Sequence, residues 1–266
     1  MSARRDARAD ELFDALANRL LEAEQSGRLL LPFTREHADL TLTDAYEIQA
    51  RVAALKSRSG LRHIGWKTAF TNPIIRERFQ AREPTRGHLF ETALTGSEAH
   101  LSGGPDFLVE PEVTFYLAHE VSGPGVTESA ILSATGGLRA SLELARTRFS
   151  GGWKLEDVTA DNAAAAYMTV SPSVMTPADV GDLASITVVL EKNGEVVAKG
   201  MGSEVLGGPP KAVAWLANQL AETGLKLAGG QIILSGSLTL PVAARAGDRV
   251  VARFDRLGTV EVKIEP

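Results

Sequence analysis

The pattern of segments after Gly65 constrains the fold more than any other feature of the sequence. From there on, short stretches that alternate apolar and polar residues are separated by Gly and Pro, as at 109–117 and 186–197. The second of these contains Asn193-Gly194 between two apolar alternations, and both residues tolerate the positive φ of a two-residue hairpin turn. The pattern predicts a strand-rich region with a β-hairpin at this turn.

Helical spacing dominates the N-terminal part of the chain. Apolar residues recur every three or four positions over residues 10–26, and a glycine follows as a C-cap. A second amphipathic helix is predicted to begin at Thr43 or Asp44 and to end at Gly60. We therefore expect a small helical N-terminal region, residues 1–62.

The rest of the chain, residues 63–266, is predicted to be a strand-rich domain interrupted by one helix. Pro209 and Pro210 suit a helix start, because the first backbone N–H groups of a helix have no partner, and Gly224 marks the far end. Together with the N-terminal helices this predicts an α+β fold. Further strands are predicted at 138–144, 231–235, 249–254 and 259–264.

Composition and charge argue against several classes of partner. The formal net charge is −5 and Lys and Arg form no dense cluster, which argues against nucleic acid. Because the chain has no cysteine, a metal site would use oxygen or nitrogen ligands. No run of about 18 apolar residues occurs, so we expect no transmembrane helix and no membrane partner. We expect a cytoplasmic protein.

The predicted strand at 109–117 carries two glutamates on one face. Side chains of an extended chain alternate, so Glu110 and Glu112 point to the same side, with Cα atoms roughly 7 Å apart. Pro111 cannot donate to a ladder, which predicts a sheet edge, a bulge or the beginning of a strand. A hard divalent cation such as Mg²⁺ would draw the two carboxylates together. The alternative is a solvated face of an antiparallel strand.

Two further residues have charges that suit such a site. Glu143 lies in the strand predicted at 138–144, on the side opposite Leu142 and Leu144, where it would also suit a surface. Lys67 follows Gly65-Trp66, and an exposed lysine is the simplest interpretation. Its functional alternatives are a cation beside an acidic substrate, or a base if burial lowers its pKa.

Several short motifs follow one another along nearly the whole chain. They are Gly65-Trp66-Lys67, Gly87-His88-Leu89-Phe90, Glu110-Pro111-Glu112, Leu142-Glu143-Leu144, Asp157 with Asp161-Asn162-Ala163, Glu191 to Val197, Ala214 to Asn218, and Ser235-Gly236-Ser237-Leu238-Thr239. In this order and spacing they resemble the 2-oxopent-4-enoate hydratase and 4-oxalocrotonate decarboxylase family, within the fumarylacetoacetate hydrolase superfamily.

The resemblance implies a strand-rich, roll-like core of the fumarylacetoacetate hydrolase C-terminal type in a homo-oligomer. It also implies a site in which Mg²⁺ or Mn²⁺ is held by three glutamates beside a small 2-oxo acid substrate. The implied metal ligands are Glu110, Glu112 and Glu143, the implied catalytic residues are Lys67 and Asp161, and the implied substrate-binding residues are Asn162, Ser237, Thr239, Arg146 and Leu89.

The implied chemistry is that of a lyase. A 2-oxo acid can chelate the ion through one carboxylate oxygen and its 2-oxo oxygen, which stabilises the enolate. A hydratase would ketonise a 2-hydroxy-2,4-dienoate and add water at C4, giving a 4-hydroxy-2-oxo acid. The alternatives are a decarboxylase of a 2-oxo-3-enedioate, of the 4-oxalocrotonate type, and a noncatalytic oligomer partner.

Two positions depart from the hydratase pattern. The family's hydratases usually have Asp where this chain has Thr85, and Asp again where it has Arg146. A threonine cannot replace a carboxylate as a base near neutral pH. The decarboxylases also lack Asp at the Thr85 position, whereas Ser235-Gly236-Ser237 is more similar to the hydratases. The gain of Arg86 and Arg146 motivates the hypothesis of a substrate with a second carboxylate, and an arginine facing solvent is the alternative.

Overall fold

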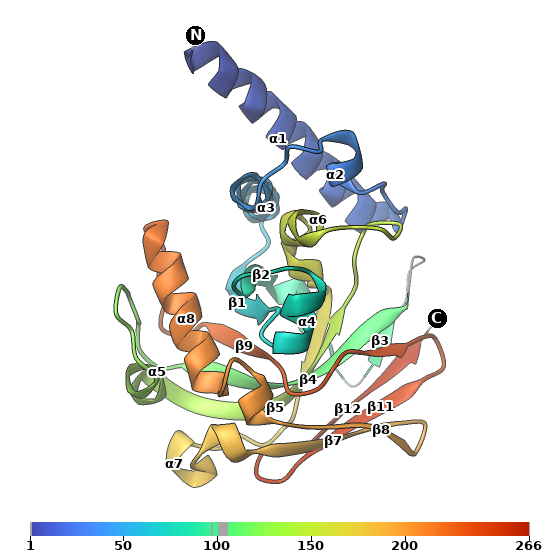
Figure 1. Ribbon diagram of the computed structural model, residues 1–266. Helices are drawn as coiled ribbons and strands as arrows, with labels where there is room; N and C mark the ends of the chain where they lie inside the picture. Colours follow the sequence, from blue (N-terminus) through green and yellow to red (C-terminus); the bar gives the residue numbers. More distant parts are fainter. Residues whose placement is uncertain (1, 97, 101–105, 266) are drawn as a thin grey trace.

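A computed structural model describes residues 2–96, 98–100 and 106–265 (Figure 1). Three helices come first, α1 (Ser2–Ser26), α2 (Phe33–Glu36) and α3 (Leu42–Arg58), and they stand at one end of the molecule, away from most of the strands. Both predicted N-terminal helices are confirmed. α3 begins earlier than predicted because Thr41 is its N-cap, and Asp44 is the third helical residue of a capping box with Thr41.

The larger of two sheets has seven strands, in the order β2-β1-β9-β4-β5-β6, with β10 paired to β4. All pairings in it are antiparallel except the one between β1 and β9. Its strands are β1 (His63–Ala69), β2 (Thr85–Phe90), β4 (Phe107–Leu117), β5 (Thr135–Ala145), β6 (Tyr167–Val170), β9 (Ile232–Ser237) and β10 (Val242–Ala244).

The second sheet has five strands, in the order β3-β12-β11-β7-β8. The predicted hairpin joins β7 to β8, with Asn193 at φ 55° and Gly194 at φ 88°, so this prediction is confirmed. The strands predicted at 249–254 and 259–264 are also present. The strands of this sheet are β3 (Glu98–His100), β7 (Thr187–Lys192), β8 (Glu195–Met201), β11 (Arg249–Phe254) and β12 (Gly258–Glu265).

The remaining helices cover the sheets and their connections. The longest is α8 (Pro209–Glu222), which begins at the predicted proline pair, lies against α5 and β9, and buries one apolar side in the main core. The others are α4 (Pro73–Arg78), α5 (Glu128–Ala134), α6 (Leu155–Ala160) and α7 (Pro177–Val180), with 3₁₀ turns η1 (Glu91–Ala93), η2 (Asn162–Ala164), η3 (Leu183–Ser185) and η4 (Gly202–Glu204).

β4 and β5 separate the main core from the candidate site. On one face their apolar side chains are buried in the main hydrophobic cluster, and on the other face Glu110, Glu112, Ser141 and Glu143 lie together. The α+β fold with helices before a curled, strand-rich core is confirmed. The buried core residues of this pair of strands include Val109, Val113, Phe115, Leu138, Leu142 and Leu144.

Of the three positions that Pro111 allowed for its strand, the sheet edge is wrong, because β4 lies between β9 and β5. The bulge alternative fits: the register with β9 shifts between Glu112 and Thr114. The carbonyl of Pro111 accepts from the N–H of Leu238, just beyond the end of β9. The N–H and C=O of one strand residue point to the same side. The side on which Pro111 lacks an N–H therefore faces the point where β9 ends, and no ladder hydrogen bond is lost there.

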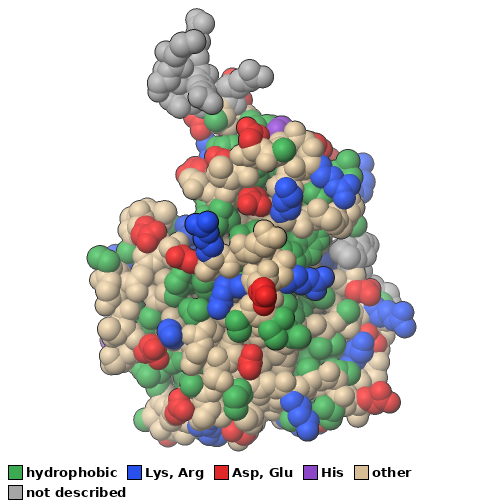
Figure 2. All heavy atoms as spheres, viewed as in Figure 1, with side chains coloured by type: hydrophobic (Ala, Val, Ile, Leu, Met, Phe, Trp, Pro, Cys, Tyr) green, Lys and Arg blue, Asp and Glu red, His purple; other side chains and the backbone are tan. Residues whose placement is uncertain are grey.

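The N-terminal helices have a hydrophobic cluster of their own, which includes Leu16, Phe33 and Ile48. It also contains Phe149 and Ala160 from the later part of the chain, so the division at residue 62 stays a prediction. Acidic and basic side chains are interspersed over the face shown in Figure 2. Within the described residues, no helix combines the length and apolar character needed to cross a bilayer.

Candidate metal centre

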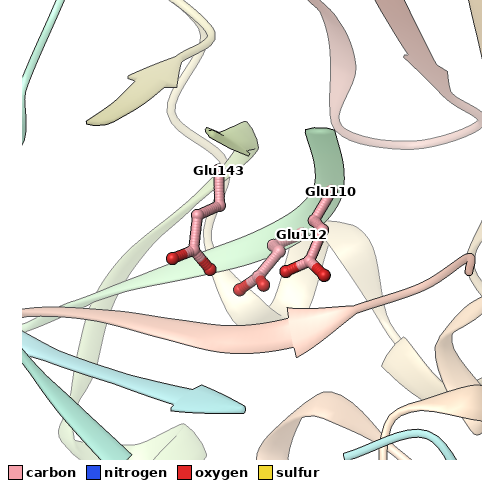
Figure 3. A group of neighbouring side chains, drawn as sticks. All are labelled: Glu110, Glu112 and Glu143. Atoms are coloured by element: carbon pink, nitrogen blue, oxygen red, sulfur yellow. The ribbon is translucent and has the colours of Figure 1, made fainter. Parts of the chain in front are cut away.

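Three carboxylates from β4 and β5 converge at one point. Glu110 lies directly opposite Glu143 in the antiparallel pair, and Glu112 lies opposite Ser141. Each glutamate offers one oxygen, and these oxygens all lie within 4.8 Å of one another (Figure 3). The structure thus brings together the three residues that the resemblance implies as metal ligands.

Glu112 is completely buried, and one of its oxygens is held by the backbone. Its Oε2 accepts from the N–H of Gly236 at 2.8 Å, where the chain bulges at the end of β9. Gly236 has φ 103°, and a Cβ there would lie 2.3 Å from Oγ1 of Thr71, so only glycine fits. The other oxygen, Oε1, has no hydrogen-bond partner, and neither has Oε2 of Glu143.

Buried carboxylate oxygens without partners need an explanation, because leaving them unsatisfied costs free energy. A hard divalent cation supplies one, since Mg²⁺ and Mn²⁺ prefer oxygen ligands and the group is made of carboxylates alone. Burial, followed by the charge of Glu143, raises the pKa of Glu110 to about 7. Burial and both neighbouring carboxylates raise the pKa of Glu112 well above its usual value. A bound cation would relieve this repulsion, so the residues fit the metal that the family implies.

Lys67 supplies the positive charge beside these carboxylates. It is 1% exposed, and its Nζ lies 2.5 Å from Oε1 of Glu143 and 3.0 Å from the carbonyl oxygen of Ala163. Burial alone would lower the pKa of Lys67, but the charges of Glu143, Glu110 and Glu112 outweigh burial and raise it. Of the two functional alternatives, this arrangement favours a protonated cation over a base.

Asp161 and Asn162 directly precede Ala163, whose carbonyl contacts Lys67, but their side chains make hydrogen bonds to other residues. Oδ2 of Asp161 accepts from the backbone N–H of Arg148 at 2.7 Å and from Oγ1 of Thr147 at 3.1 Å. Burial raises the pKa of Asp161 to about 6, against the opposing effect of Arg148. The side-chain amide of Asn162 bonds both the N–H and the C=O of His88. The side chain of Asp161 therefore binds the backbone of Arg148, and the side chain of Asn162 binds the backbone of His88.

The remaining implied substrate-binding residues lie in different places. Ser237 pairs with Glu112 across the bulge, so it shares the carboxylate face. Leu89 belongs to a small apolar cluster with Met168, which lies directly opposite Glu143. Thr239 lies further along, and its hydroxyl donates to the carbonyl of Leu240.

Arg146 is not brought to the carboxylates. Its guanidinium lies 5.3 Å from the ring centroid of Phe107, and strand parity places Phe107 on the face of β4 opposite Glu110 and Glu112.

Three features of the site were missed by the sequence reasoning. The N–H of Gly236 and the carbonyl of Ala163 are backbone groups, and because nearly every residue has such groups, the residue type does not predict their role in the site. The third is the environment of Thr85, which the sequence marked only as a departure from the hydratase pattern: its hydroxyl is buried without a hydrogen-bond partner. Thr85 pairs with Ala69, so it lies on the same face of the sheet as Lys67. The glycine between Ser235 and Ser237 was the one available signal for the bulge.

Comparison with known proteins agrees with this geometry. Residues 76–265 match the family described as fumarylacetoacetate (FAA) hydrolase C-terminal. The chain is 34% identical to a 2-hydroxyhexa-2,4-dienoate hydratase of Comamonas testosteroni, over 95% of this chain and 97% of that one. It is 31% identical to a 4-oxalocrotonate decarboxylase of Pseudomonas sp. (strain CF600), over 94% and 95%.

A solved structure is also similar over nearly the full length. It is the 4-oxalocrotonate decarboxylase from Pseudomonas putida G7, complexed with magnesium and adipate. The TM-score is 0.92 and the sequence identity 28%, with 96% of this chain and 98% of that chain covered.

Proposed function

This chain belongs to the fumarylacetoacetate hydrolase C-terminal family, and from that premise we propose that it is a metal-dependent hydratase. Its relatives at about 30% identity over their full length are hydratases and decarboxylases, so it is an enzyme of this hydratase and decarboxylase group. The proposed reaction adds water to a 2-hydroxy-2,4-dienoate, through its 2-oxo-4-enoate form, and gives a 4-hydroxy-2-oxo acid. The observation that carries the proposal is the group of three converging carboxylates, of which Glu112 and Glu143 are buried, with its neighbouring lysine.

Glu110, Glu112 and Glu143 would hold Mg²⁺ or Mn²⁺, and Oε1 of Glu112 and Oε2 of Glu143 have no other partner. When bound, the cation supplies Lewis-acid polarisation of the 2-oxo group and stabilises negative charge on its oxygen. The N–H of Gly236 fixes one oxygen of Glu112, and this leaves the other free to point into the site.

Lys67 would bind and orient the acidic substrate. A lysine ammonium has three N–H donors, and the contacts with Glu143 and Ala163 account for two of them. The third is available to a substrate carboxylate or 2-oxo oxygen, or to pass a proton to a carbon of the enol. Leu89, Met168 and Leu234 form an apolar wall near the carboxylate face, which would keep bulk water from the substrate's hydrocarbon tail.

A hydratase is favoured over a decarboxylase by the similarity of Ser235-Gly236-Ser237 to the hydratases, whereas the identities of 34% and 31% to relatives of the two kinds do not separate them. Thr85 is the observation that favours the decarboxylase, since it stands where the hydratases usually have Asp. Its buried hydroxyl without a partner can hydrogen-bond a substrate or a water molecule, but it cannot act as a base near neutral pH. A decarboxylase of a 2-oxo-3-enedioate is therefore the second candidate.

The test follows the ultraviolet absorbance of 2-hydroxypenta-2,4-dienoate with the purified protein, with Mg²⁺ or with a chelator. The variant Glu112→Gln keeps the shape of the side chain and removes one carboxylate. Metal-dependent decay to 4-hydroxy-2-oxopentanoate, lost in Glu112→Gln, supports the hydratase. CO₂ release from 4-oxalocrotonate without dienoate hydration would establish the decarboxylase. Tight Mg²⁺ binding with neither reaction would establish a noncatalytic protein.

A further inference from the structure

The carbonyl that accepts from Lys67 belongs to a strained turn. Asn162, Ala163 and Ala164 have φ values of 54°, 51° and 58°, which puts three consecutive non-glycine residues in the left-handed region. This conformation is unfavourable for L residues because Cβ crowds the backbone, and alanine has no side-chain group to offset the cost. The turn persists only if its surroundings hold it.

Arg148 holds both ends of this turn. Its Nη1 lies 3.3 Å from Oδ1 of Asp161, just before the turn, and its Nη2 donates to the carbonyl of Ala165, just after it, at 2.7 Å. Its backbone N–H donates to Oδ2 of the same Asp161. Arg148 is 8% exposed and Asp161 3% exposed, so water competes little for these contacts.

The guanidinium of Arg148 also forms an ion pair with a residue of the N-terminal helices. Nη2 of Arg148 lies 3.3 Å from Oε2 of Glu24 in α1, and the other oxygen of Glu24 accepts from Nζ of Lys56 in α3 at 2.6 Å. A continuous set of ion pairs and hydrogen bonds therefore runs from α3 through α1 to the turn, and from the turn to Lys67.

We propose that Arg148 and Asp161 are positioning residues, which clamp the turn so that the carbonyl of Ala163 holds the ammonium of Lys67 in place beside Glu143. The inference rests on the proposed function for the role of Lys67. It assigns Asp161 to the clamp and not to proton transfer, because both of its oxygens are engaged by Arg148. The inference also implies that the N-terminal helices help to position Lys67, because Glu24 of α1 binds Arg148.

The first test measures kcat and KM for Arg148→Lys. One ammonium cannot reach Asp161 and the carbonyl of Ala165 as the two guanidinium nitrogens do. We expect kcat to fall at least tenfold. Adding Ala164→Gly, which takes the positive φ without strain, should restore kcat at least threefold, whereas Ala164→Gly alone should change it less than twofold.

The matched control is Asp157→Asn. Asp157 is also completely buried and lies in the preceding helix α6, where its carboxylate accepts from Thr34 and from the N–H of Lys154. We expect this variant to melt at a lower temperature and to keep kcat within twofold. If Arg148→Lys loses only stability and keeps kcat, or if glycine at position 164 restores nothing, the clamp has no positioning role and the proposal is overturned.

Hydrogen exchange provides a readout that does not need activity. The N–H groups of Ala164 and Ala165 donate to the carbonyls of Asp161 and Asn162, so their exchange reports on the turn. We expect at least tenfold faster exchange of the peptide 161–165 in Arg148→Lys and no change in Asp157→Asn. Unchanged exchange in Arg148→Lys overturns the clamp even if the wild type is active.

One outcome separates the clamp from the proposed function, and a second variant covers the case in which Arg148→Lys does not fold. An inactive wild type whose turn exchanges faster in Arg148→Lys would mean that the function is wrong and the clamp is real. If Arg148→Lys does not fold, Asp161→Asn replaces it, because an amide oxygen can still accept from the N–H of Arg148 while the ion pair is lost. The same tenfold changes are then expected, and their absence overturns the proposal.

Discussion

Removing one carboxylate from the candidate metal centre should stabilise the metal-free protein. The perturbation is Glu110→Gln, which keeps the size of the side chain and removes a charge that faces Glu143 across the strand pair. Burial and the charge of Glu143 raise the pKa of Glu110 to about 7, from 4.5. The charged form of Glu110 is therefore less favourable in the folded protein than in the unfolded chain.

The sign and size of the effect follow from this difference. Between pH 4.5 and 7 the folded protein keeps a proton on Glu110 that the unfolded chain has lost, so stability falls as pH rises through this range. At about 1.4 kcal/mol for each pH unit, the full loss above pH 7 is at most about 3.5 kcal/mol. Glu110 is partly exposed, so screening by water makes the true value smaller.

The assay is urea denaturation of the wild type and Glu110→Gln in the presence of a chelator, at pH 5, 6, 7 and 8. We expect similar free energies of unfolding at pH 5, and Glu110→Gln to be more stable by about 1–3 kcal/mol at pH 8. Saturating Mg²⁺ should reverse the order, because only the wild type keeps all three carboxylates. A variant that is less stable than the wild type at pH 8 without metal would refute the reasoning.

The two remaining predictions concern the metal's pH dependence and the bulge. Because a cation must displace protons from Glu110 and Glu112, the Kd for Mg²⁺ measured by calorimetry should rise by at least about tenfold for each pH unit below 7, and a constant Kd would contradict this. Gly236→Ala should lower the free energy of unfolding by about 2 kcal/mol or more, because its Cβ would meet Thr71. Gly60→Ala is the control, since Gly60 has φ 93° with no atom within 4 Å, and an equal loss there would show that backbone strain alone is responsible.

The strands and helices could be predicted because their signals are local. Asn193-Gly194 specifies a hairpin turn by its own backbone preference, and two prolines mark the start of α8. Which strands become neighbours is not local information. Pro111 allowed an edge, a bulge or a strand beginning, and only the sheet decides among them: β4 lies inside the sheet, and Pro111 lies beside the bulge where β9 ends.

The candidate site divides in the same way. Strand alternation placed Glu110 and Glu112 on one face, but on that evidence alone a solvated surface was the better explanation, because polar alternation is usual in antiparallel strands. Only the fold puts Glu143 opposite Glu110 and buries Glu112 and Glu143. The turn at 162–164 had no sequence signal, because two of its residues are alanines, which ordinarily avoid positive φ. Its conformation depends on Arg148, which only the tertiary fold places beside it.

The insertion of β1 between β2 and β9 has a consequence for how the protein is divided into modules. The region that matches the family begins at residue 76, so it includes all three glutamates but neither β1 nor Lys67. A fragment cut at that point would keep the anionic half of the site and lose its cation, together with the strand that joins β2 to β9. The segment before the matched region thus supplies the lysine that contacts Glu143 in the candidate site, and a relative with a different segment there would have to obtain this positive charge from elsewhere.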